Sequence, residues 1–258
     1  MLKAVLFDLD RTLIDWDSAE PWEVYQARRL KKLHDFVHRE LHPLSCNADE
    51  FFETFALSLG NAWKEGNETL IAPSVMRVLD ELLRGYGVPE DRLDMHAVMT
   101  GYDWQPAEGE RAYPDVLEVL PELRAHGIQL GIVTNATLPM QHRDRELAAA
   151  GILELFPHCR ISAVEVGYLK PHRAIFERAL EMLDVRPEEA VFVGDNLRAD
   201  VRGAQAVGMY AVWRAEPGEE LPAESEIEPD GTIRTLHELL PLLDRWYPNW
   251  RANGHHKP

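Results

Sequence analysis

The chain has 258 residues, 45% of them hydrophobic and 28% charged, so it can bury the core of one large domain or two smaller ones. Its formal net charge of −17 excludes a general nucleic-acid binder, and it would repel an anionic substrate unless a local cation reversed the field. The two cysteines, Cys46 and Cys159, lie far apart, which indicates neither a disulfide framework nor a zinc site. Because neither a signal peptide nor a membrane-length apolar run is recognisable, we expect a cytoplasmic protein without a membrane partner.

The first predicted element is a buried strand that begins at Ala4 and is rich in β-favouring apolar side chains. Two carboxylates, Asp8 and Asp10, stand at its carboxyl end. Open α/β sheets bind ligands at the carboxyl ends of their strands. Taken alone, the pattern fits equally well an edge strand followed by a polar turn with solvated acids.

Helical periodicity then dominates the chain up to about residue 105. Apolar residues recur every three or four positions over residues 22–41, 47–63 and 74–84, and a shorter helix is expected after Pro89. We therefore predict an all-helical insertion over residues 16–105, behind the first strand, and call it the cap. Its aromatic residues either select a substrate or pack inside the cap, and the pattern leaves both open.

After a linker at residues 105–109, strands and helices alternate. The predicted strands cover 128–133, 160–166, 190–193 and 209–213, and the helices cover 115–125, 143–150, 172–183, 200–207 and 236–245. Residues 216–230 are predicted to form an acidic surface loop. Such alternation implies a parallel sheet with right-handed crossovers. The predicted fold class is α/β, with a Rossmann-like parallel sheet core (residues 1–15 and 106–250), the inserted cap and a flexible polar tail (251–258).

Polar side chains follow several of these strands, at Thr134, Asn135, Lys170, Asp195 and Asp200. In a parallel sheet they should converge with the two acids of the first strand. Carboxylates packed together repel one another unless a cation lies among them, and oxygen ligands without a histidine or cysteine cluster favour Mg²⁺. A lysine and a hydroxyl beside such a metal suit a phosphoryl group. Each residue also has a plain alternative, as a turn residue, a helix N-cap or a solvated lysine.

Four segments resemble, in order, the motifs of the haloacid dehalogenase-like (HAD) hydrolase superfamily. They are Asp8-Leu9-Asp10-Arg11-Thr12-Leu13, Ile132-Val133-Thr134-Asn135, Lys170-Pro171 and Gly194-Asp195-Asn196-Leu197-Arg198-Ala199-Asp200. Tyr113-Pro114-Asp115-Val116 is similar to the segment by which the chain re-enters the core in members with a helical cap. The match covers residues 4 to about 213. Arg11 departs from the pattern, because the family usually has glycine there.

The resemblance implies a set of catalytic roles. Asp8 would be the nucleophile that forms an aspartyl-phosphate, and Asp10 would protonate the leaving oxygen and later deprotonate water. Lys170 would balance the charge of Asp8 and of the phosphate. Thr134 and the backbone of Asn135 would bind phosphoryl oxygens.

The resemblance also implies the metal. Asp8, the backbone carbonyl of Asp10 and Asp195 would hold Mg²⁺, with Asp200 as an outer or supporting residue.

The function expected on this basis is a Mg²⁺-dependent phosphatase acting on a small phosphorylated metabolite. A 2-haloacid dehalogenase is the first alternative, but such members lack an acid at the position of Asp10 and do not need the metal. A phosphomutase uses the same acids and passes the phosphoryl group to a second hydroxyl. A catalytically silent binding protein is the alternative from another class, because fold alone does not imply function. The sequence fixes neither the substrate nor the oligomeric state.

Overall fold

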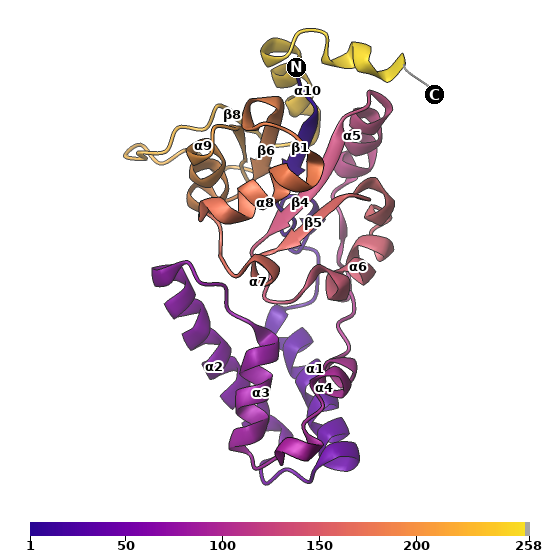
Figure 1. Cartoon of the computed structure of the whole chain (residues 1–258), viewed down its shortest axis with the longest axis vertical. Coiled ribbons are helices and arrows are strands. Elements are labelled where there is room, and N and C mark those ends of the chain that lie inside the picture. Colours follow the sequence, from indigo (N-terminus) through magenta and orange to yellow (C-terminus); the bar gives the residue numbers. More distant parts are fainter. Residues whose placement is uncertain (256–258) are drawn as a thin grey trace.

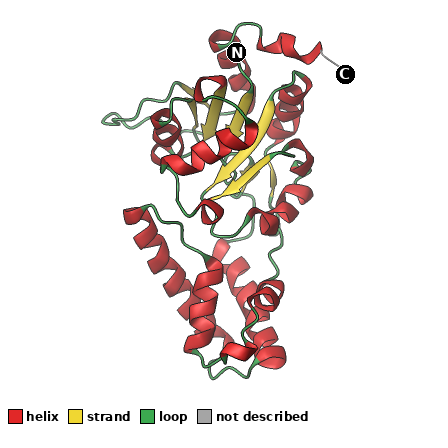
Figure 2. Cartoon of the chain, viewed as in Figure 1, coloured by secondary structure: helices red, strands yellow, loops and turns green. Residues whose placement is uncertain are grey.

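The computed structural model describes residues 1–255, and its centre is a six-stranded sheet in the order β5-β4-β1-β6-β7-β8 (Figures 1 and 2). All neighbouring strands pair in parallel. The strands are β1 (Ala4–Phe7), β4 (Gln129–Thr134), β5 (Cys159–Ser162), β6 (Ala190–Gly194), β7 (Tyr210–Arg214) and β8 (Gly231–Ile233). The predicted α/β class with a parallel sheet is confirmed.

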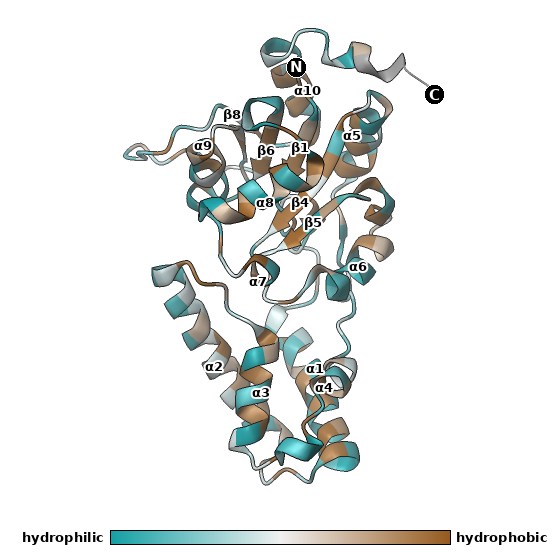
Figure 3. Ribbon diagram, in the orientation of Figure 1, coloured by the Kyte–Doolittle hydropathy of each residue, from teal (hydrophilic) through white to brown (hydrophobic). Residues whose placement is uncertain are grey.

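Helices cover both faces of this sheet, and alternate residues of β1 serve the two faces. Val5 and Phe7 join one hydrophobic cluster, whereas Ala4 and Leu6 join the other. Figure 3 shows how hydrophobic the central strands are. The helices are α5 (Pro114–Ala125), α6 (Met140–Ala149), α7 (Ala163–Val166), α8 (Arg173–Leu183), α9 (Gly203–Ala206) and α10 (Leu239–Trp246), with a π-helix at Leu197–Arg202 and 3-10 turns at Leu153–Leu155, Pro187–Glu189 and Leu236–Glu238.

The cap is a helical bundle with its own hydrophobic cluster, and it lies below the sheet in the view of Figure 1. It consists of α1 (Trp22–Phe36), a π-helix continuing it (Val37–Leu41), α2 (Ala48–Thr69), α3 (Val75–Gly85), a 3-10 turn (Glu90–Arg92) and α4 (Met95–Tyr102). Asn47 accepts hydrogen bonds from the first turn of α2, and Ser74 does so for α3.

One strand prediction needs correction, and three short strands were not predicted. The strand predicted over residues 160–166 ends at Ser162, because Ser162 and Glu165 form a capping box that starts α7. Sequence analysis also missed β8 and an antiparallel pair, β2 (Ile14–Asp15) with β3 (Arg111–Ala112). This pair lies where the chain leaves the core for the cap and where it returns. These strands are two or three residues long, which is too short for an alternation of apolar and polar residues to be recognised.

The described part of the chain ends with a 3-10 helix at Trp250–His255, where Arg251 lies 3.0 Å from Asp244. The rest of the predicted tail, residues 256–258, lies outside the described residues. Among the residues that the structure describes, no helix has both the length and the apolar character needed to cross a bilayer.

Candidate active site

Three neighbouring strands at the middle of the sheet deliver the polar residues to one edge. Asp8 directly follows β1, Thr134 is the last residue of β4, and Asp195 directly follows β6. Asp200 lies in the π-helix after β6 and points back, so Asp8, Asp195 and Asp200 each offer an oxygen within 4.8 Å of the others. Residues separated by almost two hundred positions therefore meet at one point.

Lys170 is the cation at the centre of these acids. Its Nζ donates to Asp8 Oδ1 at 2.6 Å and to the carbonyl of Val133 at 2.9 Å, and lies 2.7 Å from Asp200 Oδ1. Burial alone would lower the pKa of Lys170, but the Asp200 and Asp8 carboxylates raise it above its ordinary value. The plain alternative of a solvated lysine is excluded, since this side chain is 2% exposed.

One lysine does not neutralise the three carboxylates. The pKa of Asp8 is raised well above its usual value, first by burial and then by Asp200 and Asp195, against the opposing effect of Lys170. Burial and Asp200 also raise the pKa of Asp195 to about 6. The cluster is thus short of positive charge.

The loop geometry around Asp200 requires glycine at position 194. A Cβ there would overlap the Asp200 carboxylate, whose Oδ2 accepts a hydrogen bond from the Asn196 amide at 2.9 Å. The Asn196 side chain in turn accepts from the Ala199 amide at 2.8 Å, which makes Asn196 a helix N-cap. The strand, turn and helix start together hold Asp200 against Lys170.

The residues after β4 have different environments. Thr134 is buried and lines the cavity described below. The Asn135 side chain is bonded to the backbone of Lys170: its Oδ1 accepts from the amide at 2.7 Å and its Nδ2 donates to the carbonyl at 3.3 Å. Asn135 therefore holds the loop that carries Lys170. Because its side chain is used in these bonds, only the backbone of Asn135 is left to bind a ligand.

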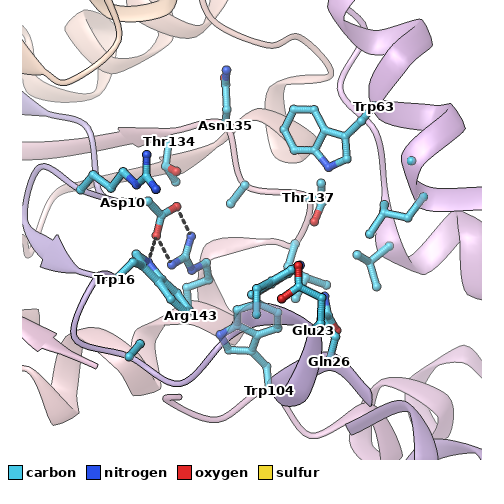
Figure 4. A pocket seen from close by; sticks show the side chains of 18 of the residues that line it. Asp10, Trp16, Glu23, Gln26, Trp63, Trp104, Thr134, Asn135, Thr137 and Arg143 are labelled. Atoms are coloured by element: carbon cyan, nitrogen blue, oxygen red, sulfur yellow. Dashed lines mark hydrogen bonds and ion pairs between the residues drawn. The ribbon is translucent and has the colours of Figure 1, made fainter. Parts of the chain in front are cut away.

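Asp10 is held by two donors that face the cavity (Figure 4). Arg143 donates from both terminal nitrogens, at 2.7 and 2.9 Å, and Trp16 Nε1 donates at 2.6 Å. Burial would raise the pKa of Asp10, but Arg143 and Trp16 lower it below the ordinary value. This arrangement favours the ionised form of Asp10, which is the form that can accept a proton.

Sequence analysis missed Arg143 because an Arg–Glu pair three positions apart on a helix is usually a solvent-exposed pair. Here Arg143 is 5% exposed and its Nε donates to the fully buried Glu146 at 2.6 Å. Trp104, at the end of the cap, donates to the other Glu146 oxygen. Glu110 lies close by, and burial together with Glu146 raises its pKa to about 8. A buried chain of contacts thus runs from the cap through Glu146 and Arg143 to Asp10.

Arg11 adopts the left-handed conformation, with φ of 60°, which favours glycine. This explains the glycine usual at the matching position of the first motif. The side chain is 53% exposed and lies 3.8 Å from Asp17 and 3.5 Å from Glu216. Arg11 adopts the backbone conformation that this loop requires, although the conformation is less favourable for arginine than for glycine.

A cavity of about 890 Å³ lies between this sheet edge and the cap. The core contributes the acids, Lys170 and Thr134 to its lining, and the cap contributes residues that include Trp63 and Trp104 (Figure 4). The donor set of the core fits Mg²⁺, because three converging carboxylate oxygens are hard ligands and are short of positive charge.

A parallel sheet that ends in an aspartate nucleophile candidate, a buried lysine and further acids, under a helical cap, defines a hydrolase of the HAD type. The haloacid dehalogenase-like hydrolase family model matches residues 2–208, and the chain belongs to this family. The chain is 35% identical over 246 residues to glyceraldehyde 3-phosphate phosphatase of Methanopyrus kandleri. The aligned region covers 94% of this chain and 97% of the relative.

Two solved structures share the fold over nearly the whole chain. A HAD phosphatase from Thermococcus onnurineus is 29% identical with a TM-score of 0.61, covering 94% of this chain and 98% of its own. A 2-haloacid dehalogenase from Pseudomonas syringae is 27% identical with a TM-score of 0.66, covering 95% and 100%. Since both activities occur on this fold, the choice between them depends on the site residues.

Proposed function

We propose that this protein is a Mg²⁺-dependent phosphatase that hydrolyses a small phosphorylated metabolite through an aspartyl-phosphate on Asp8. The observation that carries the proposal is the meeting of Asp8, Asp195 and Asp200 around Lys170, with a further acid, Asp10, beside the same cavity. The phosphatase relative supports the same reaction class.

In the first step a carboxylate oxygen of Asp8 attacks phosphorus, and the bond from phosphorus to the ester oxygen breaks. Asp10, which carries the proton that it took from water in the preceding turnover, gives this proton to the departing oxygen. Lys170 stabilises the ionised form of Asp8 before the attack, and Thr134 with the backbone of Asn135 binds phosphoryl oxygens. Mg²⁺ held by Asp8, Asp195 and the Asp10 carbonyl, with Asp200 in support, would offset the charge of two anions brought together.

In the second step water attacks the phosphorus of the aspartyl-phosphate and gives a proton to Asp10, which releases phosphate and restores the Asp8 carboxylate. Arg143 favours the ionised form of Asp10 that this step needs. In this proposal the cap of residues 16–105 covers the intermediate and limits the access of other nucleophiles.

Hydrolysis of p-nitrophenyl phosphate by the purified protein, with Mg²⁺ and with EDTA, tests the proposal. We expect turnover with Mg²⁺, its loss on chelation, and a hydroxylamine-sensitive label on the protein after brief exposure to ³²P-labelled substrate. Chloride release from 2-chloropropionate that is indifferent to EDTA, without phosphate release, would instead identify a dehalogenase. Transfer of the label to an added sugar phosphate, rather than to water, would identify a phosphomutase.

A further inference from the structure

The wall of the cavity that faces the acids is apolar over its whole length along α2. Phe52, Phe55, Ala56, Leu59 and Trp63 line it at spacings of three and four residues, which places them on one face of the helix. On the same helix Leu57 lies outside this lining and is 67% exposed. One stripe of α2 is therefore directed at the space where the substrate would lie.

The charged residues of the cap that line the cavity are all acidic. They are Asp17, Glu20 and Glu23, and the described cap residues of the lining include neither lysine nor arginine. The three cations of the lining come from the core and already face carboxylates: Lys170 lies against Asp8 and Asp200, Arg143 against Asp10 and Glu146, and Arg11 near Asp17 and Glu216. A second anionic group on the substrate would find no free cation in this lining.

The size of the cavity also favours a substrate with an apolar body. Its volume of about 890 Å³ is at the upper end of the range for small-molecule sites, roughly 300–1,000 Å³. A three-carbon phosphate would occupy the space at the acids and leave the apolar stripe of α2 in contact with water. A longer hydrocarbon body would cover that stripe.

We infer that the substrate is a monophosphate ester of an uncharged, largely apolar alcohol of several carbons, with the phosphate at the acids and the hydrocarbon against α2. This inference rests on the proposed phosphatase function and adds the chemical class of the leaving group. The apolar stripe selects for the hydrocarbon. A second phosphate or a carboxylate is disfavoured, because the cations of the lining already face carboxylates.

A series of alkyl phosphates tests the inference, because leaving groups of similar basicity keep the chemical step comparable. We expect kcat/KM to rise about threefold for each added methylene from methyl to hexyl phosphate, mainly through KM, since each buried methylene favours binding by an amount of this order. 6-Phosphonooxyhexanoate and hexane-1,6-diol bisphosphate should fall at least about tenfold below hexyl phosphate. A flat series, or a preference for either of the two compounds with an anionic tail, would overturn the inference.

A lysine placed on the stripe tests the same point from the protein side. Leu59→Lys should lower kcat/KM for hexyl phosphate at least about tenfold and raise it for 6-phosphonooxyhexanoate, whereas Leu57→Lys, the same change on the outer face of α2, should alter neither. If Leu59→Lys fails to fold, Ala56→Lys puts the cation on the same stripe at an exposed position. Equal effects of the lysine on both faces would contradict the assignment.

The two proposals fail in different ways. A protein that hydrolyses p-nitrophenyl phosphate but shows no chain-length dependence is a phosphatase without the inferred specificity. A protein that hydrolyses no phosphate ester with Mg²⁺ refutes the proposed function itself.

Discussion

Replacing Asp8 by asparagine should abolish activity and stabilise the protein. Asparagine keeps the shape of the side chain and can still accept from Lys170, but it cannot attack phosphorus. Loss of a nucleophile of this kind lowers turnover by at least about 10⁴-fold. The measurement is steady-state hydrolysis of p-nitrophenyl phosphate with Mg²⁺, and activity within tenfold of the wild type would remove Asp8 as the nucleophile.

The stability gain follows from the charges around Asp8. Burial and two neighbouring acids hold its pKa well above the usual value, so the ionised group destabilises the folded state at neutral pH. Lys170 keeps a partner in the variant, because Asp200 lies 2.7 Å away. Relief of a strained active-site charge commonly stabilises a protein by about 1 to 2 kcal/mol. For a chain of this size that corresponds to a rise in Tm of about 2 to 8 °C.

The pH dependence provides the decisive check. An acid whose pKa is raised in the folded state destabilises that state only above its unfolded pKa. The stability difference between Asp8→Asn and the wild type should therefore be present at pH 7 and shrink toward pH 4, in urea unfolding without metal. Asp91→Asn, at an exposed cap position, is the control and should change neither activity nor stability. A variant that is less stable than the wild type by more than about 2 kcal/mol would refute the electrostatic argument.

Three further predictions concern the groups around the site. Gly194→Ala should lower kcat at least about tenfold, because the new Cβ displaces Asp200 from Lys170; unchanged kcat would contradict this. Arg143→Met should reduce the free energy of unfolding by about 3 to 5 kcal/mol, because it leaves the buried Glu146 unpaired, and Arg143→Met/Glu146→Leu should recover more than half of the loss in urea titrations. Glu110, with its pKa raised to about 8, should make the protein lose stability as pH rises from about 4.5 to about 8, and Glu110→Gln should flatten that slope, which unfolding at several pH values measures.

The sequence indicated most of what lies on the sheet, because a strand leaves a local signal. Apolar runs that end in polar residues located β1, β4 and β6, and the parallel order then implied that Asp8, Thr134 and Asp195 share an edge. The same reasoning lost accuracy where a local side-chain bond ends an element. The Ser162 capping box, which ends β5 four residues before the predicted end, is the clearest case.

The surroundings of the acids could not be predicted, because they depend on contacts between distant segments. Lys170 has the local sequence of a surface lysine, and only its packing against Asp8 and Asp200 buries it. Arg143 and Glu146 have the spacing of an exposed helix pair, and their burial depends on Trp104 at the C-terminal end of the cap.

These distant contacts also connect the cap to the site at two separate places. Residues 70–72, between α2 and α3, pair through their backbone with Gly167–Leu169, directly before Lys170, at 2.8 and 3.0 Å. At the C-terminal end of the cap, Trp104 contacts Glu146, which holds Arg143 against Asp10. Lys170, beside the proposed nucleophile, and Asp10, the candidate acid–base residue, are thus each supported by a different segment of the cap. Because the same insertion also supplies the apolar wall of α2, the proposed contacts for the leaving group and the support for the candidate catalytic residues belong to one packed unit.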